Sequence, residues 1–379
     1  MKICLVVPHF PPYVGGGEQL YYDIAKGLLR RGHQVRVVTA ADGATGHRVY
    51  DGIDVWYCPW RIVFGHPLAR LQDIRPHVQW SDLVHTAVYT TAPVARRAAR
   101  RAGKPVIVLI HEIIGSRWGW FEPDPVKALA FRTYEYLVSR LSYDGYHVVS
   151  ESTKRDYLRF ISKREHIYRI YNSLHVPPME QVAASSASLR ACFGLPEGQR
   201  TFLYFGRPAP NKGVFVLQKA ISILRQRGSI PEDVTFCFLL SGEPRDQRAR
   251  FLENVRSMGL EDVVLVHPSV ERSQLFKLVL DADYVVVPSV NEGFGFSAAE
   301  ACSLGKPVIS SDGGSLPEVV WGRRLLFENG NSQALADCLE QVVRRGEDCF
   351  DAVPEKRFDT ETMLDAIEAM YEDVRKNRG

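Results

Sequence analysis

Residues 285–310, VVVPSVNEGFGFSAAEACSLGKPVIS, constrain the fold more than any other stretch of the chain. The valine run at 285–287 is typical of a strand buried on both faces, and a loop with glycines follows it. The small residues after the loop predict a helix over 297–304, and the apolar run at 307–310 predicts a second strand. A strand, a helix and a strand in this order indicate one unit of a parallel α/β sheet.

Two carboxylates bracket the turn of this unit: Glu292 in the loop and Glu300 in the helix. The first backbone N–H groups of a helix and the positive end of its dipole favour phosphate. Carboxylates repel phosphate but accept hydrogen bonds from neutral hydroxyls, so the combination predicts a pocket for a sugar nucleotide. The alternative is that both glutamates are solvated, and the small apolar neighbours of Glu300 favour the pocket.

Length and composition indicate a globular protein of two domains, since 379 residues exceed one ordinary α/β core. The formal charge is +8 over residues 1–180 and −5 over residues 181–379, so we expect the first half to meet an anionic partner. The odd number of cysteines, without CxxC spacing, favours a reducing compartment. Residues 1–12 are too short for a signal peptide, and no apolar run reaches the ~20 residues of a membrane span. We therefore expect a cytoplasmic location.

Alternating strand and helix patterns predict two doubly wound parallel sheets, one in residues 1–175 and one in residues 201–355. Residues 176–200 are predicted to be a linker, and 356–379 a final helix that crosses back to the first domain. Strands are predicted at 3–8, 34–39, 55–58, 83–85, 106–110, 145–150, 166–170, 202–205, 235–240, 263–267, 284–287 and 308–310. Helices are predicted at 17–31, 93–102, 126–141, 152–160, 215–226, 247–258, 272–280, 297–304, 333–344 and 361–376.

A second motif, YFGRPAPNKG at 204–213, follows a predicted strand and leads into a helix. Arg207 and Lys212 lie near the N-terminus of that helix, where the dipole disfavours cations. A dianion between them would account for their position, so the motif predicts a diphosphate site. The alternative is two ordinary surface cations.

The first strand–helix junction holds a third motif, GGGE, with Gly15 and Gly16. The chain has no GxGxxG pattern, so a dinucleotide fingerprint is not supported, and the loop is interpreted as a phosphate-approaching turn. His111 ends the most apolar strand of the first half, where catalytic groups of α/β folds gather. Its neighbour Glu112 completes no metal site, because the sequence places no third ligand. Asp283 belongs to an Asp-Ala-Asp sequence that we interpret as turn and capping chemistry.

A basic and aromatic surface is predicted in the first half. It combines cations at helical spacing with tryptophans of the following loop, as at an anionic membrane surface, although a solvated helix face is an equal alternative. The residues are Arg96, Arg97, Arg100, Arg101, Lys104, Trp118 and Trp120. No nucleic-acid module is recognisable, so we expect no nucleic-acid partner.

The motifs together resemble a known family. The chain is similar, nearly from end to end, to GT-B glycosyltransferases of the glycosyltransferase group 1 class, the retaining family 4. The matching segments are PHFPPYVGGGEQ, VIVLIHE, VVSESTKRD, RIYNS, YFGRPAPNKG, LLSGEP, DADYVVVPSVNEGFGFSAAEACSLGKPVIS and GGSLPEVV. The resemblance implies two Rossmann-like domains that face each other across a cleft, with hinges near 173–200 and 355–360.

The resemblance also implies roles for individual residues. Arg207 and Lys212 would bind the donor diphosphate, Glu300 the ribose hydroxyls, and Glu292 the transferred sugar. Gly15 and Gly16 would approach the diphosphate, and His111 would lie near the reacting sugar. The backbone of Gly293, Phe294, Gly295 and Phe296 would contact sugar and phosphate. Residues 267–270, HPSV, depart from the family where a glycine is common, in a region that frames the nucleobase.

The predicted function is sugar transfer from a UDP- or GDP-sugar to the hydroxyl of a glycan or lipid-linked acceptor. The resemblance implies retention of configuration, no metal and no other cofactor. Another GT-B enzyme of sugar nucleotides, an epimerase or a phosphorylase, is one alternative. A non-catalytic sugar-nucleotide binder is another, and the complete set of two cations and two carboxylates argues against it.

Overall fold

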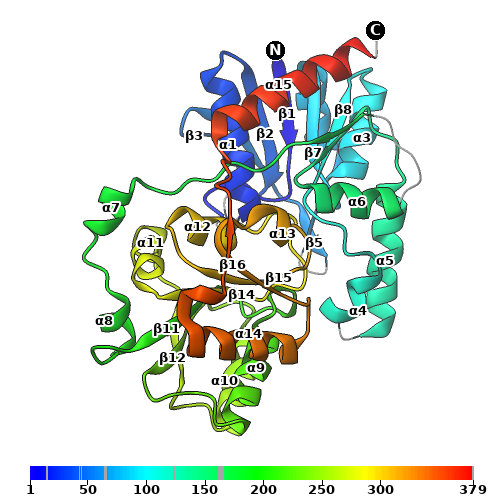
Figure 1. Ribbon diagram of the computed structural model, residues 1–379. Coiled ribbons are helices and arrows are strands. Elements are labelled where there is room, and N and C mark those ends of the chain that lie inside the picture. The colour runs from blue at the N-terminus through cyan, green and yellow to red at the C-terminus, as the bar shows by residue number, and fades with distance from the viewer. Residues whose placement is uncertain are drawn as a thin grey trace. The chain divides into compact units, whose positions relative to one another are not determined.

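The computed structural model describes residues 1–13, 16–41, 43, 45–63, 66–122, 124–160 and 166–377 (Figure 1). The chain forms two compact units. Unit 1 comprises Met1–Ser173 and Phe358–Gly379, and unit 2 comprises Leu174–Arg357. Each unit contains its own largely parallel sheet with helices, so the predicted α/β class is confirmed.

The main sheet of unit 1 has the order β10-β9-β8-β7-β1-β2-β4-β3, and all neighbours are parallel except β3 and β4. The strand order reverses between β1 and β7, which places a topological switch point at the carboxyl ends of these two strands. The strands are β1 (Lys2–Val6), β2 (Gln34–Ala40), β3 (Gly46–Tyr50), β4 (Ile53–Cys58), β7 (Leu83–Ala87), β8 (Val106–Ile110), β9 (Gly145–Val148) and β10 (Ile167–Arg169).

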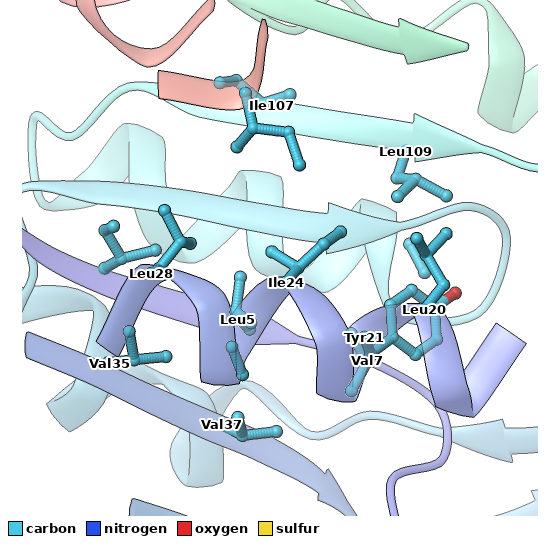
Figure 2. Packing of buried hydrophobic residues seen from close by; sticks show 14 of the residues in the cluster. Leu5, Val7, Leu20, Tyr21, Ile24, Leu28, Val35, Val37, Ile107 and Leu109 are labelled. Atoms are coloured by element: carbon cyan, nitrogen blue, oxygen red, sulfur yellow. The ribbon is translucent and has the colours of Figure 1, made fainter. Parts of the chain in front are cut away.

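Helix α1 (Gly16–Arg30) covers one face of this sheet with a regular apolar stripe. Leu20, Ile24 and Leu28 recur every fourth residue and pack on buried side chains of β1 and β2, among them Leu5 and Val37 (Figure 2). The final helix, α15, joins the same hydrophobic cluster. Unit 1 is therefore built from both ends of the chain.

Helix α15 (Thr360–Lys376) packs directly on α1. Gly27 permits this contact, because a Cβ atom there would lie 2.4 Å from Cδ1 of Leu364. Tyr371 is fully buried, and its hydroxyl is 2.8 Å from Nδ1 of His85 on β7. The helix thus belongs to the core of unit 1 rather than to its surface.

The opposite face of the sheet has a second cluster, to which Ile74, Ala95 and Tyr157 contribute from three helices. The segment 60–80, over which no strand or helix was predicted, contains a two-stranded antiparallel pair and α2. The remaining elements of unit 1 are β5 (Arg61–Val63), β6 (His66–Leu68), α2 (Leu71–Trp80), α3 (Ala92–Arg101), α4 (Trp118–Phe121), α5 (Pro125–Ser139) and α6 (Glu151–Phe160).

The sheet of unit 2 has the order β13-β12-β11-β14-β15-β16-β17, parallel except for β16 and β17. Its order reverses between β11 and β14, so the loops after these two strands lie side by side at a switch point. The strands are β11 (Arg200–Gly206), β12 (Val234–Leu240), β13 (Val264–Pro268), β14 (Tyr284–Val287), β15 (Val308–Ser311), β16 (Gly322–Phe327) and β17 (Asp351–Val353).

The helices of unit 2 include the predicted one after the glycine loop. The segment predicted as a linker contains two short helices, α7 and α8, and is grouped with unit 2. The helices are α7 (Met179–Ala183), α8 (Leu189–Phe193), α9 (Val214–Gln226), α10 (Arg245–Ser257), α11 (Arg272–Asp281), α12 (Phe296–Ser303), α13 (Leu316–Val319) and α14 (Ser332–Arg345).

Besides the elements of segment 60–80, helix α4 and the helices of the predicted linker, three strands and one short helix were not predicted from the sequence: β3, β16, β17 and α13. Strands β3 and β17 lie at sheet edges and are mostly exposed, so they lack the apolar run of a buried strand. Strand β16 begins with Gly322 and two arginines, which conceals its apolar second half. The apolar pattern therefore does not reveal these strands, which are recognised only from their hydrogen bonds to neighbouring strands.

Candidate functional site

The two motifs of unit 2 meet at the switch point of its sheet. The Arg–Lys loop, residues 207–213, follows β11, and the glycine loop, residues 288–295, follows β14. The backbone N–H of Val290 donates to the carbonyl oxygen of Asn211 at 2.8 Å. Neighbouring strands therefore bring together residues that are about 80 positions apart in the sequence.

Gly213 makes the close approach of the two loops possible. Its φ of +67° lies in the left-handed region, and a Cβ atom there would lie 1.7 Å from the carbonyl oxygen of Pro288. No side chain fits in that space. The glycine that ends the Arg–Lys loop is thus required by both its own conformation and the neighbouring loop.

Lys212 and Glu292 form an ion pair between the two loops. Nζ of Lys212 lies 2.7 Å from Oε1 of Glu292, and the hydroxyl of Ser289 donates to the same oxygen at 2.9 Å. The Glu292 side chain is 11% exposed and that of Lys212 27%, so the pair is largely shielded from water. The sequence predicted both residues but not that they contact each other.

A third loop, after β15, supports the backbone of Glu292. The N–H of Ser315 donates to the carbonyl oxygen of Glu292 at 3.1 Å. Gly314 has φ +58°, and a Cβ there would lie 2.4 Å from that same oxygen. Asn329 adds a hydrogen bond from Nδ2 to the carbonyl oxygen of Val290 at 2.9 Å. The glycine loop is therefore held by backbone contacts on several sides.

Glu300 is buried, as its small apolar neighbours predicted, with its side chain only 5% exposed. Its Oε1 accepts from Nη2 of Arg272 at 2.6 Å, and the same Nη2 is 3.4 Å from the carbonyl oxygen of His175. Burial raises the pKa of Glu300, and the nearby Arg272 guanidinium opposes that shift. Arg272, the first residue of α11, was not identified from the sequence as part of this site.

The remaining predicted donor residues of unit 2 lie around the start of α12. Arg207 is exposed, and among the described residues none of the ion pairs involves it. Gly293 lies in the loop, Gly295 caps α12 with φ +91°, and a Cβ there would meet Leu316 at 2.9 Å. Phe294 is buried, and its ring centroid lies 5.0 Å from that of Phe296. These contacts fix the glycine turn whose N–H groups open the helix.

In unit 1, His111 follows β8 and lies against the first turns of α1. Its Nε2 is 2.6 Å from the hydroxyl of Tyr21, and a Cβ at Gly17 would lie 3.7 Å from the same nitrogen. The hydroxyl of Thr153 donates to the His111 carbonyl oxygen at 3.2 Å. Desolvation lowers the pKa of His111 to about 4, so the ring is neutral at physiological pH. Gly16 is the first residue of α1, and Gly15 lies outside the described residues.

The loop after His111 is held by hydrogen bonds to a carboxylate that was not identified from the sequence as part of the site. Glu135 of α5 is fully buried and accepts four hydrogen bonds. The donors are the N–H groups of Ile114 (2.8 Å) and Gly115 (2.7 Å), the Tyr89 hydroxyl (2.6 Å) and Trp118 Nε1 (3.0 Å). The carboxylate of α5 thus fixes residues 114–118.

The predicted basic and aromatic surface is only partly exposed. Trp118 is half-buried, because its indole binds Glu135 and its ring packs on Phe131 at 5.1 Å between centroids. Trp120, in contrast, is 59% exposed. Arg97, Arg100 and Arg101 are exposed, Arg96 and Arg100 both donate to the carbonyl oxygen of Ser142, and Lys104 lies beyond the end of α3.

Acidic residues elsewhere in unit 2 have structural roles. Asp283 accepts hydrogen bonds from the backbone and the hydroxyl of Thr201 at 2.8 and 2.9 Å, and Asp281 pairs with Lys277. Both aspartates thus make structural contacts with other residues of unit 2, and their interpretation as turn and capping chemistry stays a prediction. Within the part of the chain that the structure describes, no group of three or more His, Cys, Asp or Glu residues could hold a metal ion.

Comparison with known proteins identifies the family. A model of the "Glycosyl transferase 4-like domain" matches residues 15–173, and a model of "Glycosyl transferases group 1" matches residues 186–357. The chain belongs to the group 1 glycosyltransferases. The resemblance noted in the sequence motifs is thereby confirmed, and the sheets of both units lie within the matched regions apart from the first strand of unit 1.

Two curated relatives of this group 1 glycosyltransferase cover most of both chains. A D-inositol 3-phosphate glycosyltransferase of Xylanimonas cellulosilytica is 29% identical over 354 residues, which is 86% of this chain and 83% of the relative. A GDP-mannose:cellobiosyl-diphosphopolyprenol alpha-mannosyltransferase of Xanthomonas campestris is 25% identical, over 93% of this chain and 90% of the relative.

The solved structure of the Anabaena protein HepE in complex with UDP and glucose has a TM-score of 0.73 to this chain, at 21% identity. The similarity covers 98% of this chain and 99% of HepE, and it confirms the GT-B fold. Among the described residues, no helix combines the length and the apolar character needed to cross a bilayer.

Proposed function

We propose that this group 1 glycosyltransferase transfers a hexosyl residue from a UDP- or GDP-sugar to a hydroxyl of a glycan or lipid-linked acceptor. A nucleotide-sugar donor is supported by a relative named for GDP-mannose and by a structural neighbour bound to UDP and glucose. The named acceptors of the two relatives, an inositol phosphate and a polyprenol-linked saccharide, support a hydroxyl acceptor. The activity would serve glycan, glycolipid or polysaccharide biosynthesis.

The observation that carries the proposal is the contact between Lys212 and Glu292 at the switch point of unit 2. A cation for phosphate and a carboxylate for hydroxyls are the two groups that a sugar nucleotide requires at its diphosphate–sugar bond. Arg207 lies on the same loop as Lys212, with its side chain exposed. Glu300 adds a second, buried carboxylate for a ribose diol, and Arg272 keeps it in place.

The proposed chemistry is departure of the nucleoside diphosphate from the anomeric carbon and attack by the acceptor hydroxyl. Lys212, Arg207 and the N–H groups at the start of α12 would stabilise the charge that develops on the leaving phosphate. We propose that this stabilisation takes place without a metal ion. Retention of configuration follows from the family resemblance, with the leaving phosphate accepting the acceptor proton on the same face. His111 is proposed to act near the transferred sugar.

Peripheral attachment to an anionic membrane from the cytoplasmic side is part of the proposal. Its support is the exposure of Arg97, Arg101 and Trp120, together with a relative named for a polyprenol-linked acceptor. Cationic and aromatic side chains are the usual contacts of peripheral proteins with anionic head groups.

Donor binding can be tested by thermal shift with a panel of UDP- and GDP-sugars, for the wild type and for the Lys212→Ala variant. We expect one nucleotide class to stabilise the wild type and a smaller shift for the variant. Lys219→Ala is a matched control, because Lys219 is exposed on α9 of the same unit. No stabilisation by any nucleotide sugar would contradict the proposal.

Product analysis with a labelled donor separates the alternatives. A transferase makes a new glycoside on an acceptor, an epimerase changes the sugar on the nucleotide, and a phosphorylase needs inorganic phosphate. A non-catalytic binder would give the thermal shift without any product. Anomeric configuration of the product, read by NMR, tests retention, and activity in excess EDTA tests the absence of a metal requirement.

A further inference from the structure

The outer face of α5 exposes large apolar side chains in unit 1. Val126, Leu129 and Leu137 are 75%, 63% and 59% exposed, and Trp120 of the preceding α4 is 59% exposed. Large apolar residues that are exposed singly are ordinary, but a group of them on one helix marks a contact surface. Figure 1 shows α4 and α5 as consecutive helices of this unit.

The apolar residues of α5 form a line along the helix. Positions 126, 130, 133 and 137 are spaced by four, three and four residues, so they share one face. Ala130 and Thr133 have small side chains, and they lie between the larger side chains of Val126 and Leu137. Leu129 lies beside this stripe. An amphipathic helix normally turns such a stripe inward, whereas here it is exposed.

Cations border the stripe along the helix, and Asp124, which caps α5, is the acidic residue at its N-terminal end. Lys127 and Arg132 are exposed on its two sides, and Arg140 is exposed at the C-terminal end of the helix. The one acidic residue within α5, Glu135, is fully buried on the opposite face. An apolar stripe between cations complements a bilayer with anionic head groups, whose acyl chains take the apolar side chains while the cations contact phosphates.

The cationic face of α3 adjoins the same surface. Arg96 and Arg100 donate to Ser142, which lies three residues beyond Ser139, the last residue of α5. These two guanidinium groups therefore lie against the chain that leaves the C-terminal end of α5. The arginines of α3, which were predicted from the sequence, thus lie near the end of the helix whose exposed apolar face was not predicted.

The buried face of α5 reaches the loop after His111. Through Glu135, α5 binds the N–H groups of Ile114 and Gly115 and the indole of Trp118. A helix that docks on a membrane with its outer face would thus hold this loop with its inner face. Helix α5 would therefore contact the membrane on one face and, through Glu135, the residues that follow His111 on the other.

We propose that the outer face of α5, together with Trp120, docks on an anionic phospholipid bilayer and is the main membrane contact of this enzyme. The proposal deepens the peripheral attachment described above and rests on it. It replaces Trp118 with the stripe Val126–Leu137 as the apolar part of the contact. The cations of α3 contribute charge beside it.

The test is co-sedimentation of the full chain with vesicles of phosphatidylcholine, with and without phosphatidylglycerol. We expect binding to the anionic vesicles at low salt, weaker binding at high salt, and little binding to phosphatidylcholine alone. The double substitution Leu129→Glu and Leu137→Glu is expected to lower the partition coefficient at least about tenfold. Lys127→Glu with Arg132→Glu is expected to abolish the preference for anionic lipid.

Val49→Glu is the matched control, since Val49 is 64% exposed on the edge strand β3 of the same unit. It should bind vesicles as the wild type does. The thermal shift with the donor nucleotide is read on every variant, so loss of donor binding is distinguished from loss of docking. Wild-type partitioning by the α5 variants, or a wild type that stays in the supernatant, overturns the proposal. So does a wild-type dimer, seen by analytical ultracentrifugation, that the Leu129→Glu and Leu137→Glu substitutions dissociate.

Discussion

Arg272 and Glu300 form an ion pair in which one partner is buried and the other is half exposed. The guanidinium Nη2 lies 2.6 Å from Oε1 of Glu300, whose side chain is 5% exposed, against 53% for Arg272. The ion pair uses Oε1, and we expect Oε2 of Glu300 to accept from a substrate hydroxyl. Arg272 is therefore a positioning residue for the carboxylate assigned to the donor ribose.

Substitution of Arg272 should reduce both stability and donor affinity. Arg272→Gln leaves a buried carboxylate without its cation, which we expect to cost about 1–3 kcal/mol, less than a fully buried pair because the guanidinium is half in solvent. Thermal unfolding and the KM for the donor measure the two effects. The double variant Arg272→Gln with Glu300→Gln should recover stability but not donor affinity. If the double variant loses as much stability and as much donor affinity as Arg272→Gln, the positioning role is contradicted.

Removal of Lys212 should act mainly on turnover. In the ligand-free chain Lys212 pairs with Glu292, and a donor diphosphate would compete for the same ammonium group. We expect Lys212→Ala to lower kcat by about 10²–10³-fold, as for the loss of one group that stabilises developing charge. Steady-state kinetics with the identified donor provide the measurement, with Lys219→Ala as control. Near-normal transfer by both Lys212→Ala and Arg207→Ala would remove the assignment.

Gly213 offers a test of the contact between the two loops. Gly213→Ala adds a methyl group that would lie 1.7 Å from the carbonyl oxygen of Pro288, so the loops must separate. Gly228 is the matched control: its φ is +65°, and a Cβ there meets nothing within 4 Å. Gly228→Ala should cost about 1–2 kcal/mol from backbone strain alone. Gly213→Ala should cost clearly more in urea unfolding and should also weaken nucleotide binding, and equal costs would show that the contact is unimportant.

The sequence indicated which residues form the candidate site better than it indicated their contacts. Glu300 could be predicted to be buried because its neighbours in the helix are small and apolar. The contact of Lys212 with Glu292 depends on β11 lying next to β14, and strand order is a non-local property that apolar patterns do not contain. Arg272 and Glu135 were missed for a related reason. Each was an ordinary charged residue of a helix until the fold placed its partners beside it.

Buried histidines in unit 1 should make the fold sensitive to acid. His85 and His147 are buried, with ring centroids 5.4 Å apart, and burial lowers the pKa of both, that of His147 to about 3. Because the unfolded chain takes up protons near pH 6.5 and the folded chain does not, stability is complete above about pH 6.5 and falls below it. No described residue offers a hydrogen-bond partner to Nδ1 of His147, so protonation there is uncompensated.

We expect the free energy of unfolding in urea to decrease by about 1–2 kcal/mol for each of these histidines between pH 7.5 and pH 5.0. His147→Gln removes one titrating group and should reduce that difference, even if the variant is less stable at both pH values. His47→Gln is the matched control, because His47 is exposed on β3 and pairs with Asp54 at the surface. If His147→Gln and the wild type lose the same free energy between the two pH values, His147 is not a source of the acid sensitivity.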